Sequence, residues 1–136
     1  MIWKRLSRSW EDRIEVLLNN RRQGNDFERL AANYLKEQGM SILKLNFYCK
    51  MGEVDIIARD NDYLVFVEVK YRNTAAKGSA IEAVTFNKMK KISRVADYYM
   101  YSHHFSGNTS VRFDVVAIEE GHLRHIKNAF EYIPVC

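Results

Sequence analysis

The sequence predicts one α/β domain with a central mixed sheet flanked by helices. Two apolar, β-branched runs, residues 54–57 and 64–69, are separated by the polar residues 59–62 and therefore indicate a β-hairpin. Apolar residues at helical spacing in 24–39 and 81–101 indicate one helix before this hairpin and one after it. The resulting order is helix, three strands, helix, two strands, which is typical of a sheet covered by helices.

Length and composition restrict the class of protein. A chain of 136 residues, 47% hydrophobic and 28% charged, can form one domain with a real core. No run reaches the roughly 18 apolar residues of a membrane span, and residues 1–6 lack the apolar stretch of a secretory signal. Cys49 and Cys136 show neither metal-binding spacing nor a disulfide framework. We therefore expect a soluble cytoplasmic protein with no membrane partner.

Residues 1–23 are interpreted as an N-terminal amphipathic arm or helix, and residues 24–136 as a single domain. In the arm, apolar side chains recur at helical spacing: Trp10, Ile14, Leu17 and Leu18. Such a helix either packs on the body of the domain or contacts a second copy of the chain in a homodimer.

The first helix of the domain is predicted over residues 24–39. Its apolar stripe consists of Phe27, Leu30, Ala31, Tyr34 and Leu35, and Gly39 stands where a helix C′ residue belongs. Asn25 followed by Glu28 fits a capping box, in which Glu28 has a structural role. The alternative is that Glu28, in the first turn, reaches toward a functional site as an additional carboxylate.

The remaining elements follow from the same patterns. Residues 40–48 predict a strand that leads into the hairpin, and residues 73–79 form a small, polar loop of the kind that often folds over a substrate. The second helix begins near Ile81 or Thr85 and ends at Tyr101. Its tyrosines, Tyr98, Tyr99 and Tyr101, are interpreted as packing groups rather than base-stacking groups. Residues 111–118 and 123–127 predict two further strands joined by a turn.

Two carboxylates and one ammonium group interrupt the apolar hairpin. A two-residue turn at Asn61-Asp62, or a four-residue loop, places Asp55 directly across from Glu68, with Lys70 on the same face as Glu68. A three-residue loop would instead send the two carboxylates to opposite faces. Like charges directly opposite one another repel, and a divalent cation between them would reverse this interaction. A structural Lys70–Glu68 ion pair is the other interpretation, and it leaves Asp55 unexplained.

Net charge is +4, and the basic residues are concentrated after the hairpin. Seven basic side chains and one acid occur in residues 70–94, which suits a phosphodiester substrate, although a solvated helix face has the same pattern. Asp114 interrupts a later strand, and its partner is either the site, an arginine or a helix N-terminus. The four histidines show no metal-binding spacing and are interpreted as surface or loop residues.

The hairpin residues carry a resemblance to a known family. Asp55 followed by Glu68-Val69-Lys70 matches the D…E-x-K signature of the PD-(D/E)XK nuclease superfamily, the restriction-endonuclease-like fold. More closely, the chain from about residue 22 to 130 resembles the YraN family of small bacterial proteins. The matching residues are Gly24, Glu28, Ala31, Ala32, Leu35, Asn46, residues 52–58, residues 65–72, Lys88 and residues 112–116.

The resemblance implies a restriction-endonuclease-like core of order α-β-β-β-α-β and a magnesium-dependent endodeoxyribonuclease acting on DNA, including branched or repair intermediates. It implies that Asp55, Glu68 and the backbone carbonyl of Val69 bind Mg²⁺ or Mn²⁺, with Glu28 holding a second metal or a water. Lys70 would orient the attacking water and counter the charge that develops on phosphate.

The basic segment supplies the expected nucleic-acid contacts: Arg72, Lys77, Lys88, Lys91 and Arg94. The alternative function is a non-catalytic nucleic-acid-binding module of the same fold, acting in a DNA repair or recombination assembly.

Overall fold

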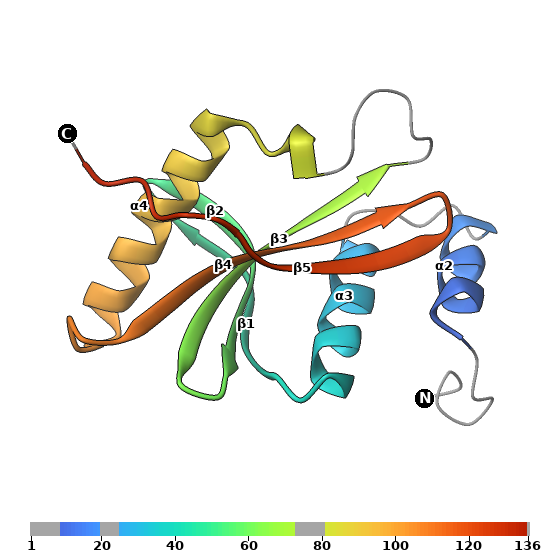
Figure 1. Ribbon diagram of the computed structural model, residues 1–136, viewed down its shortest axis with the longest axis horizontal. Helices are drawn as coiled ribbons and strands as arrows, with labels where there is room; N and C mark the ends of the chain where they lie inside the picture. The colour runs from blue at the N-terminus through green and yellow to red at the C-terminus, as the bar shows by residue number, and fades with distance from the viewer. Residues whose placement is uncertain (1–8, 20–24, 73–80, 136) are drawn as a thin grey trace.

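The computed structural model describes residues 9–19, 25–72 and 81–135. Helices and strands follow one another along these ranges as Figure 1 shows. The elements are α2 (Trp10–Asn19), α3 (Asn25–Glu37), β1 (Ser41–Cys49), β2 (Gly52–Asp60), β3 (Tyr63–Arg72), the short 3-10 helix η1 (Ile81–Ala83), α4 (Phe86–Ser102), β4 (Ser110–Glu119) and β5 (His122–Phe130). None of the helices in these ranges is long and apolar enough to cross a membrane.

The strands form one mixed sheet in the order β1-β2-β3-β4-β5. Only β3 and β4 are parallel among the described strands, and the other neighbouring pairs are antiparallel. Parallel neighbours need a long crossover, which α4 supplies here, whereas short turns join the antiparallel pairs. The predicted α/β class with a central mixed sheet is therefore confirmed, and its element order is consistent with the restriction-endonuclease-like core.

The turns that join β2 to β3 and β4 to β5 are each two residues long. Asp60 pairs with Tyr63, so the β2–β3 turn consists of Asn61 and Asp62, the two-residue alternative predicted above. Asn61 has a left-handed backbone with φ 54°. Between β4 and β5, Glu120 and Gly121 have φ of 50° and 79°, the type I′ pattern that matches strand twist. These turns fix the register of the strands that they join.

Helix α3 ends as the sequence predicts. Gly39 has φ of 99° and donates its amide to the Lys36 carbonyl at 3.0 Å. The Met40 amide donates to the Leu35 carbonyl, also at 3.0 Å. These two bonds form a Schellman motif, which satisfies carbonyls that the helix leaves unpaired and needs glycine because of the left-handed backbone.

Helix α4 begins at Phe86, after the N-cap Thr85, whose hydroxyl accepts the Lys88 amide at 3.2 Å. Residues 81–83 form a separate 3-10 turn. Tyr99 is buried on the core side of α4, whereas Tyr98 and Tyr101 are exposed. The packing interpretation is therefore confirmed for Tyr99 and wrong for Tyr101, while the Tyr98 ring, although 43% exposed, has its centroid 6.3 Å from that of Phe47.

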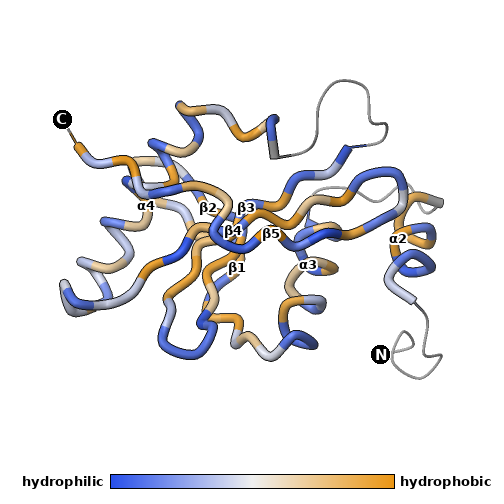
Figure 2. The backbone as a smooth tube through the Cα atoms, in the orientation of Figure 1, coloured by the Kyte–Doolittle hydropathy of each residue, from blue (hydrophilic) through white to orange (hydrophobic). Residues whose placement is uncertain are grey.

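Helices cover both faces of the sheet (Figure 1). One core lies under α2 and α3 and contains Ile56, Val65 and Val67, while the other lies under α4 and contains Val54, Ile57 and Phe66. In Figure 2 the hydrophobic colour is concentrated along the strands where they cross between the helices. The central strands β2 and β3 are therefore apolar on both faces, which makes the charges within them unusual.

Helix α2 belongs to the first of these cores. Ile14 is fully buried, the Trp10 and Tyr34 rings meet edge to face at 5.3 Å, and Arg13 pairs with Glu37 at 3.2 Å. Helix α2 therefore packs on the body of the domain.

Candidate metal-binding and catalytic site

Strands β1 and β2 rotate about their long axes where Asn46 lies beside Asp55, so that their side chains exchange faces of the sheet. Leu45 and Ile56 pack in the core under α3, but Phe47 and Val54, only two residues further along each strand, pack in the core under α4. Residues two apart in a regular strand share a face, so both strands rotate here. Asn46 makes this rotation possible, because its backbone is left-handed with φ 51°.

Because of this rotation, β2 separates from β3 at Asp55. The β2–β3 ladder ends at the pair Ile56 and Val67, one pair before Asp55 would face Glu68. In place of the next ladder bond, the Val69 amide donates to Asp55 Oδ2 at 2.8 Å. The register is the predicted one, but the directly opposed Asp55–Glu68 pair is a wrong prediction. Asp55 lies in the gap where the two strands diverge.

Glu68 lies in the same gap, on the α4 side of β3. It is only 4% exposed, and its Oε2 atom lies 3.7 Å from Lys88 Nζ and 3.9 Å from Lys70 Nζ. The carboxyl group of Glu68 is also close enough to that of Asp55 for the two to share a proton in a hydrogen bond. Lys70 therefore shares a face with Glu68, as the sequence predicts, and Lys88 joins it from α4.

Glu28 reaches the gap from the first turn of α3. Its carboxyl group is close enough to Asp55 to share a proton with it, and the neighbouring Asn46 side chain lowers its pKa in part. The sequence left Glu28 with either a capping role or a role as an additional carboxylate of the site. Its position beside Asp55 and Asn46 favours the second role. The structure therefore brings Glu28, Asp55 and Glu68 together with Lys70 and Lys88.

Burial and repulsion between the carboxylates raise the pKa values of Glu28 and Glu68. Burial, followed by the charge of Asp55, raises the pKa of Glu68 to about 8 despite the nearby lysines. The same two causes raise the pKa of Glu28 to about 7, and the Asn46 side chain opposes them only in part. Carboxyl groups gathered in this way are unfavourable for stability and are typical of functional sites.

The donor set fits a hard divalent cation that is shared with water or substrate. Glu28 Oε1 and Glu68 Oε1 are buried and have no hydrogen-bond partner. Within the described ranges, no group of three or more His, Cys, Asp and Glu side chains is arranged to hold a metal by itself. Mg²⁺ does not need such a cage, since it commonly takes one or two carboxylates and completes its shell with waters and phosphate oxygens.

The raised pKa values predict how stability depends on pH. Between about pH 5 and pH 8 the folded, metal-free protein holds protons that the unfolded chain has released, because the pKa of Glu68 rises from 4.5 to about 8 on folding. We therefore expect the melting temperature in EDTA to fall as pH rises through this window, and to fall less steeply for Glu68→Gln. Equal slopes for the two proteins would contradict this expectation.

The backbone of Asn46 predicts a second effect. Asn46→Ala should lower the free energy of unfolding by about 1–2 kcal/mol, because alanine tolerates a left-handed backbone poorly. Asn46→Gly also removes the amide next to Glu28 but relieves the backbone strain, so it should be clearly more stable than Asn46→Ala. Urea unfolding of the two variants measures the difference, and equal losses would show that the φ of 51° at Asn46 carries no cost.

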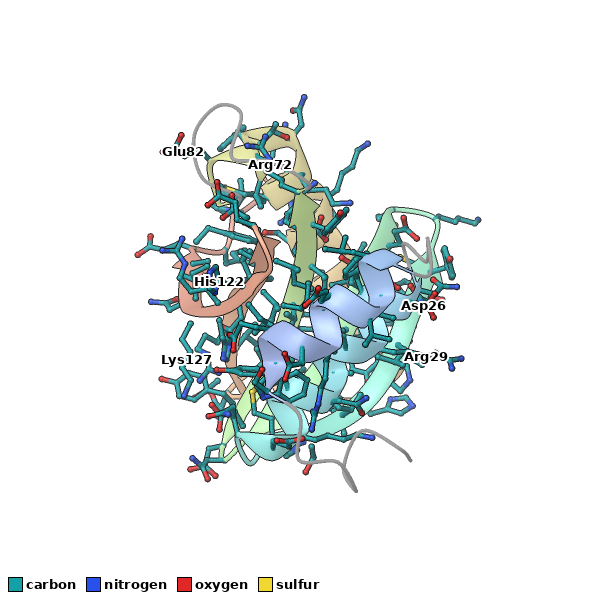
Figure 3. All side chains as sticks on the ribbon, turned by 90° about the vertical axis from the view of Figure 1, so that its right-hand side faces the viewer. Asp26, Arg29, Arg72, Glu82, His122 and Lys127 are labelled. Atoms are coloured by element: carbon teal, nitrogen blue, oxygen red, sulfur yellow. The ribbon has the colours of Figure 1, made fainter. Side chains whose placement is uncertain are left out.

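The predicted nucleic-acid contacts do not form one group. Lys88 is part of the site, and Lys91 is exposed one turn further along α4. Figure 3 shows Arg72 at the same end of the molecule as Glu82. Arg94 instead donates to the Ile133 carbonyl and pairs with Asp97 at 3.2 Å, so it holds the C-terminal segment. Lys77 lies outside the described residues.

A second buried charge cluster surrounds Asp114 on β4. Asp114 is fully buried and accepts hydrogen bonds from Arg112 at 2.9 Å, His125 at 2.7 Å and the Asn128 amide at 3.0 Å. Burial alone would raise the pKa of Asp114, but these donors hold it below its usual value. Arg112 also pairs with Asp60 at 2.9 Å. The arginine alternative for Asp114 is therefore confirmed, and the surface interpretation is wrong for His125.

Sequence reasoning missed Asn46 as a member of the site and the partners of Asp114. The position of Asn46 between the apolar residues Leu45 and Phe47 was the available signal, because asparagine tolerates a left-handed backbone. A pocket of about 460 Å³ between α4, β4 and β5 contains none of the predicted site residues. Asp97 and Glu131 line this pocket, which makes it unsuitable for phosphate.

Comparisons with known proteins agree on one family. The sequence model of the uncharacterised protein family UPF0102 matches residues 27–118, a range that contains Glu28, Asp55, Glu68 and Lys70. A UPF0102 protein of Lachnoclostridium phytofermentans is 47% identical over 114 residues, which cover 84% of this chain and 97% of that protein. Similar proteins occur in Clostridioides difficile, 44% identical over 83% of this chain and 100% of the relative, and in Vibrio cholerae, 40% identical over 84% and 96%.

Proposed function

The chain belongs to the uncharacterised protein family UPF0102, the YraN family, and from its site we propose that it is a metal-dependent nuclease acting on DNA in the cytoplasm. One observation carries this proposal. Three carboxyl groups, those of Glu28, Asp55 and Glu68, are gathered beside Lys70 at a point where the sheet opens. Such an arrangement is costly for stability, and a divalent cation with a phosphate substrate would make it favourable.

Each residue has a distinct role in the proposed reaction. Asp55, Glu68 and the Val69 carbonyl would hold Mg²⁺ or Mn²⁺, and Glu28 would hold a second ion or a water. When bound, the ion would lower the pKa of a water and offset negative charge on the phosphate. The Val69 amide fixes Asp55 Oδ2 by its 2.8 Å hydrogen bond, so this carboxylate is held in place before any ligand arrives.

Lys70 and Lys88 provide positive charge on one side of the site. Both ammonium groups lie within 4 Å of Glu68 Oε2, at 3.9 Å and 3.7 Å respectively. We therefore assign Lys70 to orienting water and to stabilising charge on the phosphate during hydrolysis, and Lys88 to contacting phosphate.

The test is an incubation of the protein with linear, nicked, flapped and four-way-junction DNA, with and without Mn²⁺. We expect cleavage of at least one substrate that needs the metal and is lost in Asp55→Asn, while DNA binding remains. Binding with a steep salt dependence but no product at any metal concentration would favour the non-catalytic binding module instead. Cleavage that persists in Asp55→Asn would overturn the proposed site.

A further inference from the structure

The solvent face of α4 carries exposed aromatic side chains. Phe86, Tyr98 and Tyr101 are 60%, 43% and 84% exposed, while the opposite face of the same helix packs in the core through Ile92 and Val95. Figure 1 shows α4 lying along one side of the sheet, and the C-terminal segment crosses this helix, where Ile133 bonds to Ser93 and Arg94. Phe86 is the first residue of α4, and Tyr98 and Tyr101 lie in its last turns, so exposed aromatic rings occur at both ends of this helix face.

Cations lie between these rings. Lys90 Nζ lies 5.7 Å from the Phe86 ring centroid, and Lys90 and Lys91 are both exposed. Asp97 is the single acid of α4, and it is engaged by the Tyr132 hydroxyl at 2.9 Å and by Arg94 at 3.2 Å. The exposed face of α4 therefore combines aromatic rings with net positive charge.

The same helix starts at the proposed catalytic site. Lys88, in its first turn, contacts Glu68, and Lys91 and Tyr98 follow along the helix. The ten residues from Lys88 to Tyr98 span about 15 Å at the rise of an α-helix. A chain of phosphates that reaches Glu68 beside Lys88 would therefore continue past Lys91 toward Tyr98 and Tyr101.

We propose that the exposed face of α4 binds an unpaired nucleic-acid strand and directs it to the carboxylate site. Lysines would contact its phosphates, and the rings of Tyr98 and Tyr101 would stack on its bases. Bases in a duplex are already stacked and paired, so a ring on a helix surface can be used in this way only by an unpaired strand. The inference rests on the proposed function and narrows its substrate to DNA with a single-stranded segment.

The test measures binding apart from cleavage. In EDTA, fluorescence anisotropy with a labelled oligothymidylate and with a duplex of equal length compares the wild type with the double variant Tyr98→Ala, Tyr101→Ala. We expect the Kd for the single strand to rise about 30-fold or more and that for the duplex to change less than about twofold, since stacking on both rings is lost. The double variant Tyr98→Phe, Tyr101→Phe should restore single-strand binding, because phenylalanine keeps the ring.

Tyr48→Ala is the matched control, because Tyr48 is 69% exposed but lies on β1. An equal loss in this control, an equal loss for the duplex, or no single-strand binding by the wild type would overturn the proposal. So would a wild-type dimer that the alanine variant converts to a monomer in sedimentation, because the face would then be a contact between copies. Single-strand binding without metal-dependent cleavage would retain this surface and refute the nuclease function alone.

Discussion

Asp114→Ala should lower the free energy of unfolding by about 3–5 kcal/mol, the cost typical of removing one partner from a buried ion pair. Asp114 is fully buried and is bound by Arg112, by His125 and by the Asn128 amide. Without the carboxylate, the Arg112 guanidinium keeps only Asp60 as an anionic partner among the contacts described. Urea or thermal unfolding followed by circular dichroism measures the loss.

Two variants make this expectation specific. Asp114→Asn keeps the volume but not the charge, and its deficit should shrink in acid, because the pKa of Asp114 lies below its usual value and its stabilising effect disappears once the carboxylate is protonated. Asp62→Ala removes an exposed carboxylate from the nearby turn and should change stability by no more than about 0.5 kcal/mol. A loss below about 1 kcal/mol for Asp114→Ala would show that the cluster contributes little to stability.

Glu68→Gln should abolish metal-dependent cleavage, with a loss of at least about 1000-fold in kcat/KM. A metal-assisted reaction gains several kcal/mol from its ion, and each 1.36 kcal/mol corresponds to a factor of ten. Glutamine preserves the shape of the side chain but removes the charge from a carboxyl group whose pKa is already about 8. We therefore expect the variant to fold normally and to give no manganese-binding heat by isothermal titration calorimetry at pH 8.5.

Glu53→Gln is the control, since Glu53 is an exposed carboxylate that acts on Glu28 only through its charge. This variant should retain both manganese binding and cleavage. Lys70→Ala should bind manganese but cleave poorly, which separates charge stabilisation from metal binding. Normal manganese binding by Glu68→Gln would refute the assignment of this residue as a ligand.

Local patterns predict most of the fold. The stripe from Phe27 to Leu35 and the terminal Gly39 define α3, because a helix end depends on residues only a few positions apart. The Asn61-Asp62 turn likewise sets the register of β2 and β3. Tyr101 shows the limit of such patterns. The spacing of the three tyrosines does not tell which of them faces the core and which faces solvent.

The site was predictable in its composition and only partly in its geometry. Asp55, Glu68 and Lys70 stand out because charge within an apolar hairpin is unusual. The contribution of Glu28 depends on where the first turn of α3 lies relative to the sheet. The Asn128 amide that binds Asp114 comes from β5, and no pattern within β4 indicates it.

The strands, the helices and the register of the central hairpin follow from neighbouring residues along the chain, and the charged residues of the site stand out among them. The departure of β2 from β3 at Asp55, and the hydrogen bond from the Val69 amide to this carboxylate, depend on how distant segments pack. The reason is that the rotation at Asn46 is a property of two paired strands packed between two cores. Its effect on Asp55 is therefore not encoded in any single segment.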